Sequence, residues 1–216
     1  MLVNSEQIIS ALIETIQMVA FSLLFSTILG LPLGILLVVT RKGHLLQNLP
    51  FFTFLNGIIN IFRSVPFIIL LVAMIPVTRL IVGTSIGTAA AVVPLVFYAG
   101  PYIARLIENS LLEVDPGVIE AAEAMGATPG QIIFKFLIPE ALSSLVLALT
   151  IATIGLVGAS AMAGAVGGGG IGDLAITYGY QRFDTVTMMI TVAILIVMVQ
   201  GLQSLGNIAA KKIRRR

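Results

Sequence analysis

Long apolar segments, separated by short polar ones, dominate the pattern along the chain. Charged residues divide the sequence into five such segments: 15–40, 51–78, 80–104, 141–166 and 185–210. A helix that crosses a bilayer needs about 20 consecutive, mostly apolar residues, and every segment reaches that length. The pattern therefore predicts an all-α, multi-pass membrane protein with five spans.

The second segment differs from the others because Arg63 lies inside it and Pro66 and Pro76 follow. A re-entrant pair of helices is the alternative to a single span. The positive-inside rule favours five spans, because they put Arg41, Lys42 and the basic carboxyl terminus on the cytoplasmic side. We therefore expect an external amino terminus, a cytoplasmic carboxyl terminus, and Arg63 near an inner helix end.

The residues before the first segment, 1–13, carry Glu6 and no basic residue. A removable signal peptide would start with positive charge and have a shorter apolar core. We expect this leader to stay attached and to form a short interfacial helix against the outer leaflet.

Composition agrees with a membrane location and excludes several kinds of chemistry. Hydrophobic residues make up 58% and charged residues 10% of the chain, against about 45–50% and about 25% in soluble domains. Cysteine is absent and His44 is the only histidine, so neither a thiol nucleophile nor a metal cluster is expected. We predict one membrane domain over 1–216, whose basic tail anchors to the lipid bilayer rather than to nucleic acid.

The polar segment 108–140, between the third and fourth apolar segments, begins with complete signals for a short helix. Asp115 is a predicted N-cap, and Pro116 suits the first helical position because its missing N–H is harmless there. Gly126 supplies a left-handed stop. A helix is therefore predicted between Asp115 and Gly126.

A second helix is predicted directly after this stop. Thr128 and Gln131 form a capping-box pattern around Pro129. Pro139 is expected to end or redirect the second helix before the fourth span.

The first of these helices carries one narrow face of small and flexible side chains with helical spacing. The face consists of Val118, Ala121, Ala122 and Met125, flanked by Glu120 and Glu123. An amphipathic helix lying in the membrane interface is the simpler interpretation of such a string in isolation. Its place after three spans and before two, followed by a second capped helix, favours a docking surface instead.

The same residues resemble the signature of permease subunits of binding-protein-dependent ABC importers of the type I fold. That signature is E-A-A, three residues, G, nine residues and I-x-L-P. Its matches here are Glu120, Ala121, Ala122, Gly126 and Pro139, with Phe136 replacing the isoleucine and Ile138 the leucine. The segments 62–67 and 167–183 are also similar to the methionine-importer branch of this family.

The resemblance implies a mechanism and a set of partners. The polar segment would dock as coupling helices into an ATPase through Glu120, Ala121, Ala122, Met125, Gly126, Phe136 and Pro139. ATP and Mg would bind to that separate ATPase, present in two copies, and this chain would bind no cofactor. A second copy of the chain, an extracytoplasmic solute-binding protein and a bacterial inner membrane complete the expected assembly. The absence of a G-x-x-x-x-G-K-[ST] motif agrees with a motor on another chain.

The fourth span is dense in small residues and offers candidates for the translocation pathway. Gly158, Ser160 and Met162 could line it or its outer gate, although small residues equally permit close helix packing. Arg63 could take part in gating, or it could extend to headgroups or pair with an acidic neighbour. An uncharged lining suits a zwitterion with a thioether, such as methionine.

The external segment after this span contains the spacing G-x-G-x-x-G at positions 167, 169 and 172. That nucleotide-binding pattern works only between a strand and a helix, so we expect a flexible external hinge instead. Tyr178, Tyr180 and Arg182 follow it and could contact the solute-binding protein.

Other classes of function fit less well. An intramembrane hydrolase needs a nucleophile and a base, whereas His44 is predicted in a loop and no carboxylate lies in the predicted spans. A secondary transporter would suit broken helices, but the sequence has no evident inverted repeat and no buried ionisable residue to couple protons. An ABC importer permease for another small solute and a secondary transporter stay as alternatives, and a non-transporting membrane scaffold is a third possibility.

Overall fold

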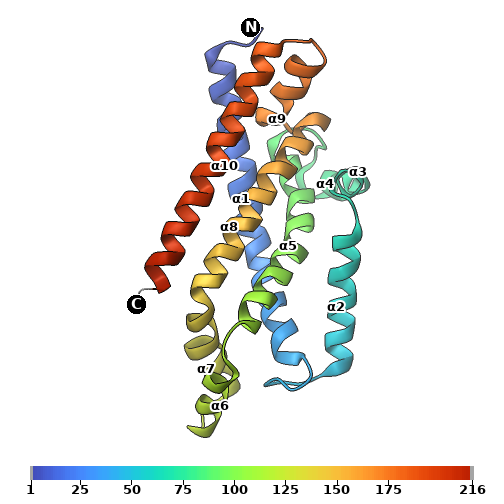
Figure 1. The fold of residues 1–216 in the computed structure, drawn as a ribbon. Helices are drawn as coiled ribbons and strands as arrows, with labels where there is room; N and C mark the ends of the chain where they lie inside the picture. Colours follow the sequence, from blue (N-terminus) through green and yellow to red (C-terminus); the bar gives the residue numbers. More distant parts are fainter. Residues whose placement is uncertain (1, 215–216) are drawn as a thin grey trace.

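The computed structural model describes residues 2–214, which form a bundle of helices without any strand in that range. Four of the helices are long and apolar enough to cross a membrane: α1 (Ser5–Thr40), α5 (Thr88–Leu112), α8 (Ile138–Ala163) with its preceding turns, and α10 (Thr185–Arg214). They run side by side along the bundle (Figure 1). The predicted all-α, multi-pass architecture is confirmed.

Helix α1 is one continuous helix that includes most of the leader. Asn4 caps it through a reciprocal pair of bonds: its Oδ1 accepts from Gln7 N–H at 2.9 Å, and Gln7 Oε1 accepts from Asn4 N–H at 3.0 Å. Nothing between this cap and Thr40 stops the helix, and Pro32 is accommodated inside it. The separate interfacial helix predicted for the leader was therefore wrong.

The second apolar segment is broken into α2 (Leu49–Ser64), α3 (Phe67–Ala73) and α4 (Ile75–Val82). Helices α2 and α3 meet at 98°. The break lies at Val65, whose extended backbone (φ −84°, ψ 122°) is the conformation that a following proline favours. The second segment is therefore broken, and within residues 2–214 a fifth crossing exists only if the bent pair is counted as one span.

Arg63 lies near the end of α2 that is remote from the loop 41–48. Helix α2 starts beside that loop and runs to the level of α3 and α4 (Figure 1). Fourteen residues at about 1.5 Å each place Arg63 roughly 21 Å along the helix. The expected position near an inner helix end was therefore wrong.

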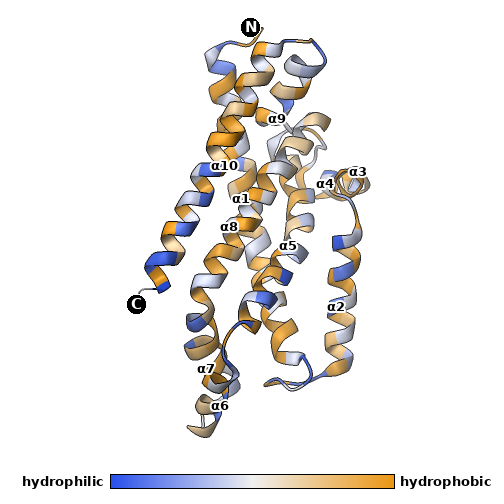
Figure 2. Cartoon of the chain, in the orientation of Figure 1, coloured by the Kyte–Doolittle hydropathy of each residue, from blue (hydrophilic) through white to orange (hydrophobic). Residues whose placement is uncertain are grey.

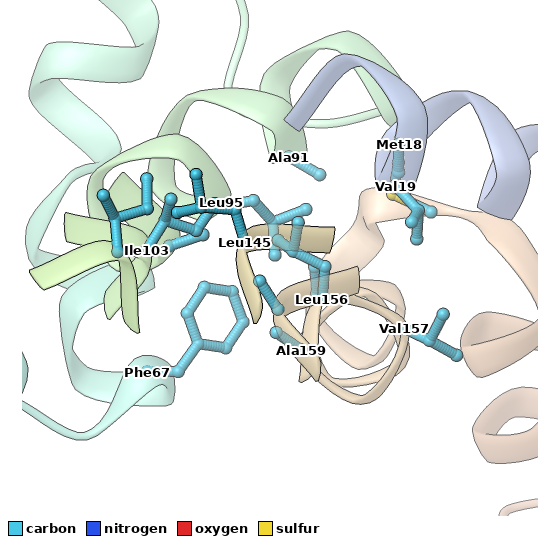
Figure 3. Close-up of a cluster of buried hydrophobic side chains, with 14 of the residues drawn as sticks. Met18, Val19, Phe67, Ala91, Leu95, Ile103, Leu145, Leu156, Val157 and Ala159 are labelled. Carbon is cyan, nitrogen blue, oxygen red and sulfur yellow. The ribbon is translucent and has the colours of Figure 1, made fainter. Parts of the chain in front are cut away.

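Helices α1 and α5 approach each other closely because glycines face the contact. A Cβ on Gly34 would lie 2.7 Å from the Ala104 carbonyl oxygen, and one on Gly30 would lie 2.8 Å from that of Gly100. Small residues allow such backbone approach in membrane bundles, where van der Waals packing replaces the hydrophobic effect. Beside this seam, buried side chains of α1, α5 and α8, including Met18, Leu95 and Leu156, converge in the core (Figure 3).

The glycine-rich segment after α8 is a packed turn and not a free hinge. A kinked segment, Gly164–Gly168, in which Val166 and Gly167 leave the helical backbone conformation, leads to α9 (Gly170–Leu174). Helix α9 folds back so closely that a Cβ on Gly172 would overlap the Ala161 backbone. The Glu14 carboxylate accepts from Gly170 N–H at 2.7 Å, and Thr15 Oγ1 accepts from Ile171 N–H at 2.9 Å. These bonds fix the turn to α1, so the expectation of a flexible hinge was wrong.

The amino-terminal end of the chain is tied to the start of α10 by Asp184. Its carboxylate accepts hydrogen bonds from Leu2 N–H, from Thr187 Oγ1 at 2.7 Å and from Thr187 N–H at 3.2 Å. These donors, the Leu2 N–H first among them, lower the pKa of Asp184 to about 2.

We predict that Gly34→Ala lowers the stability of the solubilised protein, because the new methyl group would push against the Ala104 carbonyl. Overpacking of this kind costs about 1–3 kcal/mol. Gly57→Ala is the matched control, since a Cβ at that helical position meets no atom within 4 Å. Thermal unfolding in detergent measures both, and equal midpoints for the two variants would contradict the close α1–α5 contact.

We predict that Asp184→Asn lowers the unfolding midpoint near neutral pH but has little effect at pH 2. The folded-state pKa of Asp184 lies below its ordinary value of 3.8, so its stabilisation is present above about pH 4 and is lost as pH falls towards 2. Unfolding midpoints of wild type and variant, measured from pH 6 to pH 2, should converge. A difference that stays constant over this range would rule out the charged cap.

Candidate functional site

Helix α6 (Pro116–Ala124) begins and ends as the sequence predicts. Asp115 Oδ1 accepts from Gly117 N–H at 2.8 Å at its start. At its end Gly126 adopts φ +79°, its N–H bonds to the Glu123 carbonyl at 2.8 Å, and Ala127 N–H bonds to the Ala122 carbonyl at 3.1 Å. This pair of bonds is a Schellman motif, which reverses the chain towards α7.

Helix α7 (Pro129–Ile132) has the predicted capping box between Thr128 and Gln131. It does not end before α8, however, because a π-helical segment, Ile133–Leu137, joins the two. In this segment Ile138 N–H bonds to the Ile133 carbonyl, one residue further back than in an α-helix. The widened turn accommodates Pro139, which has no N–H to give, so the predicted helix end at Pro139 was wrong.

The small-residue face predicted on α6 is partly buried and partly exposed. Ala122 is fully buried, with an exposed fraction of 0%, whereas Met125 is 70% exposed. Ala121 and Gly126 are also exposed, and Val118 is half-buried. Ala122 therefore packs within this chain and is not accessible to a partner.

The accessible part of this end of the bundle is a mixed apolar and acidic surface. We call the exposed residues Glu120, Ala121, Glu123, Met125 and Phe134 the coupling surface. Phe134 is 70% exposed and was missed, because it lies in the mostly apolar run 132–138, where the sequence does not mark which side chain faces outward. Of the other predicted residues, Pro139 is exposed and Phe136 is half-buried.

A cleft of about 480 Å³ separates α6 from the loop 41–48. His44 of the loop and Glu120 and Glu123 of α6 are among its lining residues. Burial, and then the charge of Arg41, lower the pKa of His44, so this imidazole is neutral at pH 7.

A buried ionic network fixes the helices that lead into this surface. Glu108 on α5 is only 2% exposed and pairs with Arg105 at 2.5 Å and with Arg41 at 3.7 Å. The other terminal nitrogen of Arg105 donates to Asn56 Oδ1 at 2.6 Å and to Asn60 Oδ1 at 2.9 Å, both on α2. One cluster thus joins the end of α1, the middle of α2 and the last turns of α5. Its member Glu108 lies eight residues before the start of α6.

This network was not predicted, because the third predicted span ended at Ala104. Helix α5 continues to Leu112, so Glu108 belongs to a long apolar helix and not to a loop. The expectation that no carboxylate lies inside such a helix was wrong, as was that of no buried ionisable residue. The arginine pairing explains how the charge is tolerated, because buried charges need partners.

The structure brings together two of the four predicted pathway residues. Gly158 and Met162 share an exposed face of α8, one helical turn apart. Ser160 is 1% exposed and donates to the Val157 carbonyl at 2.8 Å, so it lies away from that face. Arg63 lies on α2 and is not part of that face.

The predicted external residues lie at the opposite end of the bundle from α6. The Arg182 guanidinium stacks over the Tyr178 ring at 4.5 Å from its centroid. Tyr180 is exposed at the end of the π-helical segment Ala175–Tyr180. Arg182 is exposed and Tyr178 is half-buried. The segment that carries these three residues lies near the amino-terminal end of the chain (Figure 1).

Comparison with known proteins gives consistent results for sequence and fold. Residues 30–216 match the family model of the binding-protein-dependent transport system inner membrane component. The probable D-methionine transport system permease protein MetI of Vibrio cholerae is 52% identical over 213 residues, 99% of this chain and 95% of that protein. The D-methionine transport system permease protein MetI of Yersinia pestis is 60% identical over 151 residues, 70% of each chain.

Two solved structures have a similar backbone. An inward-facing structure of the MetNI methionine ABC transporter superposes with a TM-score of 0.96 at 48% identity, covering 97% of both chains. An amino acid ABC transporter crystallised with histidines superposes with a TM-score of 0.79 at 22% identity, covering 98% of this chain and all of the other. The second likeness concerns the fold alone.

We predict that Glu108→Gln destabilises the chain, because Arg105 and Arg41 would lose their buried counter-charge. Breaking one side of a buried ion pair costs about 3–5 kcal/mol. The double variant Glu108→Gln, Arg105→Gln should recover part of this loss, since it removes charges of both signs. Chemical denaturation in detergent checks the order, and a double variant with the summed loss of both single variants would contradict the pairing.

Proposed function

Because the chain belongs to the family of binding-protein-dependent transport system inner membrane components, we propose that it is the permease subunit of an ATP-driven importer for methionine. Curated relatives that align over nearly its whole length carry the D-methionine transport name. The observation that carries the proposal is the agreement of backbone and sequence over 97% of both chains with the MetNI transporter. D-methionine, L-methionine and related amino acids form the proposed substrate class.

The coupling surface is the proposed contact with a separate ATPase. It protrudes from one end of the bundle (Figure 1), and the caps at Asp115 and Gly126 make it rigid. An ATPase that closes on ATP and Mg would push on α6, and the buried network would pass this motion to α1, α2 and α5. Glu120 and Glu123 suit basic groups on the ATPase, while Met125 and Phe134 suit an apolar socket.

A second copy of the chain and a second ATPase complete the proposed assembly. The face of α8 that carries Gly158 and Met162 is open in the single chain, and an aqueous pathway there needs a wall from another protein. A symmetric partner supplies the same face from the other side. The lining would then be uncharged, as a zwitterionic amino acid requires.

The proposed orientation puts the coupling surface in the bacterial cytoplasm and the amino terminus outside the inner membrane. Four basic residues, Arg41, Lys42, Lys211 and Lys212, then fall on the cytoplasmic side, as the positive-inside rule favours. Tyr178, Tyr180 and Arg182 would face outward, where an extracytoplasmic solute-binding protein delivers the substrate.

The test is uptake of labelled methionine by proteoliposomes that contain the chain, its ATPase and the binding protein. Wild type should import with ATP, and Met125→Asp should reduce uptake at least about tenfold, because a buried unpaired charge costs more than 1.4 kcal/mol at a protein interface. Met125→Leu, which keeps an apolar side chain of similar size, should retain uptake.

Two further measurements make this experiment decisive. Unlabelled methionine should compete with the label and alanine should not, and equal competition by both would overturn the substrate. ATPase that co-purifies with wild type and with Met125→Leu should be lost with Met125→Asp. Full uptake by Met125→Asp would contradict the coupling role of α6.

A further inference from the structure

A cleft between α8 and the last turns of α10 has no place in the transport mechanism above. Its volume is about 300 Å³, and its lining residues are Ser143, Leu147, Asn207, Ala210, Lys211 and Arg214. This end of α10 lies beside α8 and apart from α6 and α7 (Figure 1). The cleft is therefore separate from the coupling surface.

The polar groups at this cleft are arranged as donors. Ser143 Oγ donates to the Ala210 carbonyl at 3.1 Å, which fastens α8 to α10 at the cleft. Asn207 Oδ1 accepts from Gln203 Nε2 at 3.1 Å, so the side-chain nitrogen of Asn207 remains as a donor.

The two cations of the cleft have no carboxylate partner. Within residues 2–214, no Asp or Glu oxygen lies within 4 Å of the charged nitrogens of Lys211 or Arg214. Glu140, one turn before the lining residue Ser143 on α8, also lies farther than 4 Å from these nitrogens. A site that offers only cations and N–H donors suits a phosphate group, which accepts from Lys as a point charge and from Arg through paired bonds.

The last four turns of α10 have the pattern of a helix at a bilayer surface. Polar side chains recur at positions 200, 203, 204, 207, 211 and 214, which share one side of the helix. On the other side Leu205 and Ile208 are 67% and 65% exposed. Figure 2 shows the same change along α10, from a hydrophobic body to a hydrophilic end. Such a segment lies where hydrocarbon meets headgroups.

We propose that this cleft binds the headgroup of an anionic phospholipid. Lys211 and Arg214 contact the phosphate, Asn207 donates to it or to the headgroup, and Leu147 faces the beginning of the acyl chains. Basic pockets between membrane helices on the cytoplasmic side bind anionic headgroups in this way. The bound lipid joins α8, which carries the pathway face, to α10.

The experiment uses the full chain in detergent and titrates phosphatidylglycerol or phosphatidylcholine with identical acyl chains, with bound lipid counted by native mass spectrometry. Phosphatidylglycerol should bind more tightly to wild type. Lys211→Gln should weaken its binding about fivefold, and Lys211→Gln with Arg214→Gln about 25-fold, following the contribution of each basic residue near a lipid surface. Binding of phosphatidylcholine should change less than about twofold.

Lys212→Gln is the matched control, because it removes the same charge from the same helix at a position outside the cleft lining. It should leave phosphatidylglycerol binding within about twofold, and a loss equal to that of Lys211→Gln would overturn the site in favour of diffuse attraction. Lys211→Arg should retain binding, which separates loss of charge from damage to the fold. Inorganic phosphate at millimolar concentration should not displace the lipid, and full displacement would overturn the lipid assignment.

Discussion

The ion pair between Glu108 and Arg105 is the contact on which the half of the bundle nearest α6 depends. A carboxylate that is 2% exposed must keep its partners, because an uncompensated charge in a low-dielectric interior costs several kcal/mol. Arg105 also reaches Asn56 and Asn60 on α2, and Arg41 at the end of α1 completes the cluster. These contacts hold α1, α2 and α5 together close to the start of α6.

Helix α6 is connected to the rest of the bundle through α5. Helix α5 ends at Leu112, and only three residues separate it from α6, which Asp115 caps. Helix α5 also packs against Gly30 and Gly34 of α1, where the two backbones approach too closely for a side chain. The close α1–α5 contact opposes sliding between these two helices. In the proposed mechanism, a displacement of α6 would therefore move whole helices of the bundle.

The sequence predicts those parts of this fold that local chemistry determines. The caps at Asp115 and Thr128 and the left-handed Gly126 follow from backbone rules that act within a few residues. The errors occur where distant contacts decide. Glu108 pairs with Arg105 of its own helix, but Arg105 also binds Asn56 and Asn60 of α2, and Glu108 also pairs with Arg41 at the end of α1. Ala122 is buried only because α6 packs back on its own chain. The i,i+3 spacing of Arg105 and Glu108 indicates their pairing, but no spacing within α5 or α6 indicates the contacts with α1 and α2 or the burial of Ala122.

The broken second segment shows the same division between local and distant causes. Pro66 indicates a break in the helix, because a proline disfavours the helical conformation of the residue before it, here Val65. The sequence does not predict the angle of the bend, because that angle depends on how α3 packs. Phe67 of α3 is buried against Tyr98 of α5, with ring centroids 5.0 Å apart. Helices α3 and α4 therefore lie across the bundle instead of continuing along it, and α2 crosses only part of its length. A chain built in this way leaves the α8 face of Gly158 and Met162 uncovered by its own helices, and this is the face that the proposed second copy would close.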